Sequence, residues 1–146
     1  MLSVTKTWRD LPAAHRQPNH DGHCRLVHGH NWAFDITFSC EKLDENGFVV
    51  DVGKLGEIKS FLTDLFDHTL LINQSDPLLP AFQEMERNGI VNLRVVPNCG
   101  MEGLAEHVSL QIQLLLYKEK KWVDRKLEVR EVVCWEDSKN RATIRL

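Results

Sequence analysis

The chain has 146 residues, 42% of them hydrophobic and 27% charged, as in an ordinary globular protein, and this length predicts one domain over residues 1–146. A net charge of −3 argues against a nucleic-acid partner, and no apolar run is long enough to span a membrane. The N-terminus lacks the pattern of a signal peptide and the four cysteines form no CxxC pair, so we expect reduced thiols and a cytoplasmic location.

Strand patterns dominate the first third of the chain. Residues 2–9 and 31–40 alternate between apolar and polar side chains, which predicts two strands. The intervening residues 10–22 are rich in proline and turn-forming residues and predict a loop. An Asn46-Gly47 turn predicts that residues 48–50 form a short returning strand.

Helix patterns follow. Apolar residues at three- and four-residue steps predict two long amphipathic helices, from 52 to about 67 and from about 101 to 118. Residues 75–96 between them predict an irregular insert with a short helix and an extended piece. Alternation returns over 127–135 and 142–146. This order predicts an α+β fold in which two long helices pack on a four-stranded antiparallel sheet, whose open edges favour assembly with other subunits.

Histidines are concentrated in one stretch, since five of the seven fall between residues 15 and 30. His28 and His30 are two residues apart on a strand, so their side chains point the same way, about 7 Å apart. A tetrahedral zinc ion can bridge two such rings, and His15, delivered by the preceding loop, is the expected third ligand. Three protein ligands leave one position open, which is typical of a catalytic zinc. A structural site formed by Cys24, His28 and His30 is the alternative.

Cys24 lies four residues before a predicted metal ligand, between His23 and Arg25. Basic neighbours and a nearby metal favour the thiolate form. We therefore interpret Cys24 as a base or nucleophile rather than as a small core residue.

Acidic side chains supply further candidates. Asp67 precedes His68 at the end of the first long helix, where a carboxylate can orient an imidazole for proton transfer, although such a histidine can also serve the helix dipole. Glu136 follows a mostly apolar strand, and its carboxylate can accept two hydrogen bonds from an amino-pyrimidinone edge. Glu102 opens the second long helix, where an acid also favours the dipole.

Four motifs in this order resemble the 6-pyruvoyl-tetrahydropterin synthase / 6-carboxy-tetrahydropterin synthase family: Ala13–Arg16, Cys24–His30, Asp67–Leu71 and Glu136. The resemblance implies the T-fold, a ββααββ unit that assembles into a barrel, usually a hexamer of two stacked trimers with active sites between subunits. It also implies zinc on three histidines, proton transfer by Cys24 and the Asp67-His68 pair, and a pterin held by Glu136.

Three residues separate Cys24 from His28, a gap that resembles the bacterial 6-carboxy branch. That branch implies 7,8-dihydroneopterin triphosphate as substrate, release of triphosphate and acetaldehyde, and a place in 7-deazaguanine (preQ0, queuosine) biosynthesis. Arg16 and Arg25 are candidates for binding the phosphate chain. Alternatives are a 6-pyruvoyl-tetrahydropterin synthase with the same site, and a zinc- or pterin-binding paralogue without turnover.

One segment departs from the family. Where the family usually reads Pro-Thr-x-Glu-Asn before the second long helix, this chain reads Cys99-Gly100-Met101-Glu102-Gly103. Only the glutamate, Glu102, is retained, so helix capping and substrate contacts must differ here.

Overall fold

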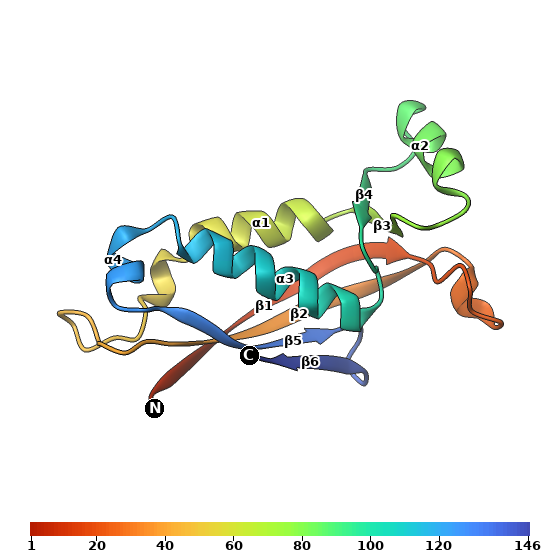
Figure 1. Ribbon diagram of the computed structural model, residues 1–146. Coiled ribbons are helices and arrows are strands. Elements are labelled where there is room, and N and C mark those ends of the chain that lie inside the picture. Colours follow the sequence, from red (N-terminus) through yellow and green to blue (C-terminus); the bar gives the residue numbers. More distant parts are fainter.

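A long antiparallel pair of strands forms the centre of one mixed sheet (Figure 1). The computed structural model describes all residues, 1–146. The sheet has six strands in the order β4-β3-β1-β2-β5-β6. The strands are β1 (Ser3–His15), β2 (His28–Ser39), β3 (Thr69–Asn73), β4 (Leu93–Val96), β5 (Glu128–Trp135) and β6 (Arg141–Arg145). The helices are η1 (His23–Arg25), η2 (Val52–Lys54), α1 (Gly56–Phe66), α2 (Leu79–Arg87), α3 (Met101–Leu116) and α4 (Lys120–Asp124).

The predicted four-stranded antiparallel sheet is wrong in two respects, the number of strands and their direction. β3 and β4 run parallel to β1, and α2 makes the crossover between them. The sequence of β3, Thr-Leu-Leu-Ile-Asn, is buried along almost its whole length, so it lacks the alternation that marks a half-exposed strand. The predicted returning strand at 48–50 does not form.

A one-residue bulge in β1 decides which face of the sheet His15 occupies. Between Trp8 and Leu11 the register against β2 shifts by one residue, and Asp10 within this step has φ +61°. Because side chains alternate along a strand, a regular strand continued from Trp8 would point His15 away from the core. The bulge instead places His15 on the core face, directly opposite His28.

Both long helices, α1 and α3, lie over one face of the sheet and leave the other face uncovered, as predicted (Figure 1). A cluster of 26 buried residues fills the space between them, including Trp32, Phe34 and Phe66. A second cluster of four buried residues lies around α2, β3 and β4. No helix has both the length and the apolar character needed to cross a membrane.

Candidate metal centre

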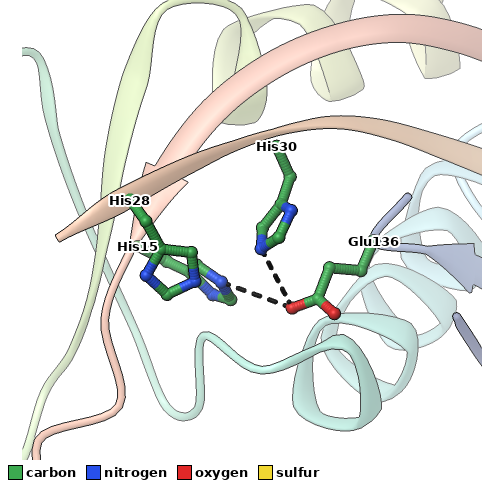
Figure 2. A group of neighbouring side chains, drawn as sticks. All are labelled: His15, His28, His30 and Glu136. Carbon is green, nitrogen blue, oxygen red and sulfur yellow. Dashed lines mark ion pairs between the residues drawn. The ribbon is translucent and has the colours of Figure 1, made fainter. Parts of the chain in front are cut away.

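Three histidines and one glutamate converge at one end of the β1–β2 pair (Figure 2). His15 is the last residue of β1, and His28 and His30 lie at the start of β2. Glu136 follows β5 and points toward the three rings from the opposite side (Figure 2). One potential ligand atom from each of the four residues lies within 4.8 Å of all the others. The predicted loop position of His15 is therefore wrong, but the three histidines do lie together.

Backbone carbonyls fix two of the rings. His15 Nδ1 donates to the Cys99 carbonyl at 2.7 Å, and His28 Nδ1 donates to the Leu26 carbonyl at 2.7 Å. Since a carbonyl can only accept, each Nδ1 carries a proton, which leaves Nε2 as the nitrogen of each ring that can face a metal. This arrangement is typical of metal-binding histidines, whose second nitrogen is held by a neighbouring group.

Burial favours the neutral form of the His15 and His30 rings. His15 is 2% exposed, and burial lowers its pKa from 6.5 to about 4, against an opposing hydrogen bond to Cys99. Burial also lowers the pKa of His30, although the nearby Glu136 carboxylate opposes the shift. Neutral imidazole is the form that binds metal ions.

Two ring nitrogens are left without a hydrogen-bond partner. The Nε2 atoms of His15 and His30 are buried and unpartnered. A buried polar atom without a partner costs about 1–3 kcal/mol, so this site is destabilised unless another group satisfies it. A metal ion on the two Nε2 atoms would remove that cost, and the donor set therefore fits a metal.

Glu136 lies among these nitrogens rather than at a separate position. Its Oε1 is 3.4 Å from His15 Nε2 and 3.2 Å from His30 Nε2 (Figure 2). Ligand atoms on a tetrahedral zinc with bonds of about 2.0–2.1 Å stand roughly 3.3 Å apart, so these separations also suit a shared metal. The sequence predicted a pterin-binding role for Glu136, and this closeness to the histidines was not predicted.

Trp32 forms the floor of the site. Its ring is fully buried and contacts the rings of His15 and His30 edge-on, at centroid distances of 5.0 and 5.5 Å. The indole N–H donates to the Ala13 carbonyl at 3.2 Å. The apolar ring thus excludes water from beneath the histidines while its one polar atom remains satisfied.

The predicted proton-transfer residues do not join this group within the chain. Cys24 lies half-buried in η1, and its carbonyl accepts a hydrogen bond from the Gln17 N–H at 2.8 Å. His68 Nδ1 lies 2.6 Å from an Asp67 carboxylate oxygen, as the sequence predicted, but the His68 side chain is 85% exposed. The backbone N–H of His68 donates to the Pro12 carbonyl.

Arg16 is not free to bind phosphate. Its guanidinium makes two hydrogen bonds of 2.7 Å to the Asp76 carboxylate, whose side chain is fully buried. The hydrogen bond from Arg16 is the main cause that lowers the pKa of Asp76. Arg25 is exposed and donates to the Gly22 carbonyl, so of the two predicted phosphate ligands only Arg25 presents its charge to solvent.

Glu102 lies exposed in the first turn of α3. Both carboxylates act on the buried Cys134 thiol, whose pKa is raised by burial first, then by Glu136 and then by Glu102. Glu102 is not one of the four residues that form the cluster.

Comparison with known proteins gives a family match. Residues 3–146 match the family described as 6-pyruvoyl tetrahydropterin synthase. A 6-carboxy-5,6,7,8-tetrahydropterin synthase of Rickettsia bellii is 30% identical over 115 residues, covering 77% of this chain and 82% of that protein. A probable 6-carboxy-5,6,7,8-tetrahydropterin synthase of Halobacterium salinarum is 35% identical over 101 residues, covering 66% and 64%. The predicted family resemblance is confirmed.

Solved structures match the fold. An uncharacterized protein from Wolinella succinogenes superimposes with a TM-score of 0.82 at 18% identity, over 99% of this chain and 97% of that one. The 6-pyruvoyl tetrahydropterin synthase of Caenorhabditis elegans superimposes with a TM-score of 0.63 at 21% identity, over 100% and 97%. The predicted T-fold class is confirmed, apart from the number and direction of strands.

Proposed function

Because the chain belongs to the 6-pyruvoyl tetrahydropterin synthase family, we propose that it is a zinc-dependent 6-carboxy-5,6,7,8-tetrahydropterin synthase. The observation that carries this proposal is the convergence of three histidines beside Glu136, two of which, His15 and His30, have buried Nε2 atoms without a hydrogen-bond partner. Relatives that carry this name in Rickettsia bellii and Bacillus subtilis support the 6-carboxy branch.

The proposed substrate is 7,8-dihydroneopterin triphosphate, and the proposed products include triphosphate and acetaldehyde. Such a product would enter 7-deazaguanine (preQ0, queuosine) biosynthesis. We also propose a cytoplasmic location, since each of the four cysteines is a free thiol.

The residues divide the chemistry among them. Zinc held by His15, His28 and His30 would polarise the side-chain hydroxyls of the substrate and acidify the adjacent C–H. Cys24, as thiolate, takes a proton from the side-chain carbon. Asp67, which already holds His68 at 2.6 Å, orients that ring for the partner proton transfer.

Glu136 and Glu102 bind the pterin ring in this proposal. The Glu136 carboxylate accepts two hydrogen bonds from the amino-pyrimidinone edge, as a carboxylate does from a guanidinium group. Its place beside the histidines supports a substrate whose ring and reacting side chain are both held close to the metal.

A neighbouring subunit completes the site in this proposal. Asp67 and His68 are exposed and make no contact with the histidine cluster of their own chain, so a catalytic pair at this position needs a second chain. The terminal strands β4 and β6 leave two open sheet edges that can pair with other copies. We propose a homohexamer with a barrel of paired sheets.

Product analysis tests the proposal. Purified zinc-loaded protein is mixed with 7,8-dihydroneopterin triphosphate, and the expected products are acetaldehyde and the 6-carboxy pterin. Cys24→Ala should abolish turnover but retain zinc, whereas His23→Ala, which removes an exposed ring from the same turn, should change neither. A 6-pyruvoyl pterin would indicate the sister activity, and bound zinc without products would indicate a paralogue that lacks turnover.

A further inference from the structure

We infer that Asn73 is a positioning residue for the metal centre and acts on His15 through the peptide backbone of Cys99. The inference rests on the proposed metal site, but it concerns residues that lie outside the ligand set. It follows from a chain of hydrogen bonds that joins β3, the segment before α3 and the end of β1.

The donor–acceptor distances of these hydrogen bonds lie within the normal range. Asn73, the last residue of β3, accepts the Cys99 N–H on its side-chain oxygen at 2.7 Å. The Cys99 carbonyl accepts the His15 Nδ1–H at 2.7 Å. The Cys99 thiol donates to the Arg16 carbonyl at 3.2 Å, and Cys99 itself is fully buried. The residue that orients His15 is therefore held through its N–H, its carbonyl and its side chain.

The orientation of the His15 ring depends on a distant part of the protein, whereas that of the His28 ring depends on a near neighbour. The carbonyl that holds His28 belongs to Leu26, two residues away on the same segment. The carbonyl that holds His15 lies 84 residues further along the chain. Its position is set by tertiary structure alone, and the Asn73 side chain holds the backbone of the same residue, Cys99, at its N–H.

The unusual Cys99–Gly103 segment, which carries the Cys99 carbonyl, needs glycine at one of its two glycine positions. A Cβ at Gly100 would lie 2.8 Å from Gln17 Nε2, just beyond the metal ligand His15. A Cβ at Gly103 would lie 2.4 Å from the Asn98 Cβ. The Gln17 amide is the end of a flexible side chain that can move aside, whereas the Asn98 carbonyl oxygen, 2.6 Å from the same Cβ position at Gly103, is backbone, so Gly103 is the glycine that this turn requires.

Zinc affinity, measured by competition with a chelator, tests the inference. We expect Asn73→Ala to weaken zinc binding about 10- to 100-fold, the usual effect of losing a group that orients a ligand. Asn73→Asp, which keeps an oxygen acceptor for the Cys99 N–H, should bind zinc nearly as tightly as the unsubstituted protein. Gln74→Ala, which removes an exposed neighbouring side chain, is the matched control and should have no effect.

The ¹⁵N resonances of His15 in the zinc-free protein give a second readout. We expect the Nδ1–H tautomer in the unsubstituted protein and a loss of that single tautomer in Asn73→Ala. A lower melting temperature with unchanged zinc affinity and an unchanged tautomer would mean that Asn73 only stabilises the loop, and would overturn the inference. If Asn73→Ala does not fold, Asn73→Ser, whose hydroxyl stops one bond short of the amide oxygen, replaces it with the same expected loss.

The two proposals fail separately. Zinc binding with the expected loss in Asn73→Ala but without any pterin product would end the proposed function and leave this inference intact. Pterin turnover together with equal zinc affinity in the unsubstituted protein and Asn73→Ala would end this inference and leave the proposed function intact.

Discussion

At the scale of single residues, the buried His15 ring links metal binding to pH. Its pKa of about 4 lies below the ordinary 6.5, so between these values the unfolded chain binds a proton that the folded chain does not. Folding stability therefore falls as pH falls through this window. For the zinc-free protein we expect the free energy of unfolding to drop by about 2 kcal/mol from His15 alone between pH 7 and pH 5.

Urea unfolding at the two pH values measures this effect. A His15→Asn variant should show a drop smaller by about the same 2 kcal/mol, because it lacks the titrating group. His23→Ala, which removes an exposed histidine, should keep the full drop. Equal pH dependence in the unsubstituted protein and His15→Asn would contradict the burial argument.

The position of Glu136 beside the histidines is compatible with two roles, pterin binding and metal ligation. We expect Glu136→Gln to raise KM for the pterin at least about tenfold, because an amide oxygen accepts the amino edge more weakly than a carboxylate. The three histidines should still retain zinc, with an affinity loss below about tenfold. A much larger loss of zinc with an unchanged KM would instead make Glu136 the fourth metal ligand.

At the scale of elements, the bulge in β1 is the local feature on which the site depends. Asp10 has φ +61°, a conformation that costs a β-branched residue about 1–2 kcal/mol. We expect Asp10→Val to lower the free energy of unfolding by that amount and Asp10→Gly to lower it by far less. Both variants lose the hydrogen bond from Asn31 to Asp10, so the difference between them isolates the backbone term. Urea unfolding that finds Val at position 10 as well tolerated as Val at the exposed position 9 would contradict this account.

The same elements show what the sequence could and could not predict. His28 and His30 were predictable because two-residue spacing on a strand needs no tertiary information. The end of β1 was not predictable, because Pro12 and the turn-rich residues after His15 are typical of a loop and because a bulge shifts the register of the strand. β3 was missed because a fully buried parallel strand lacks alternation.

Contacts between distant segments were beyond sequence reasoning altogether. The group that orients His15 is the backbone carbonyl of Cys99, and because every residue has such a carbonyl, the residue type does not indicate this contact. The same holds for the placement of Glu136 beside the histidines, which depends on the register of β5 against β2. The sequence predicts which residues are candidates for the site, but it does not predict the hydrogen bonds and contacts that hold them together.

At the scale of the whole molecule, the uncovered face of the sheet is polar. Thr5 and Thr37 hydroxyls hydrogen bond at 2.7 Å, Thr7 donates to Asp35 at 2.6 Å, and the Trp135 N–H donates to the same carboxylate at 2.8 Å. A face of this kind suits the wet interior of a barrel, so assembly would proceed through the sheet edges rather than through this face.

Mixed oligomers test whether neighbouring subunits share each site. His28→Ala and His68→Ala are each expected to be inactive, but after unfolding and refolding together they should regain about a quarter of the unsubstituted activity, the share of sites with both residues intact under random mixing. His28→Ala mixed with His30→Ala should regain none, because both variants damage the same half of the site. No recovery in the first mixture would mean that each site is built within one chain.

If the three-histidine site holds a catalytic zinc, activity must follow the zinc content of the protein, and titration of the zinc-free protein with zinc measures this dependence. Acetaldehyde release from 7,8-dihydroneopterin triphosphate is followed at each addition. We expect a folded zinc-free protein without activity, and a rate that rises in proportion to zinc and levels off at about one ion per chain. Full activity before zinc is added, or a chain that is unfolded until zinc binds, would contradict it.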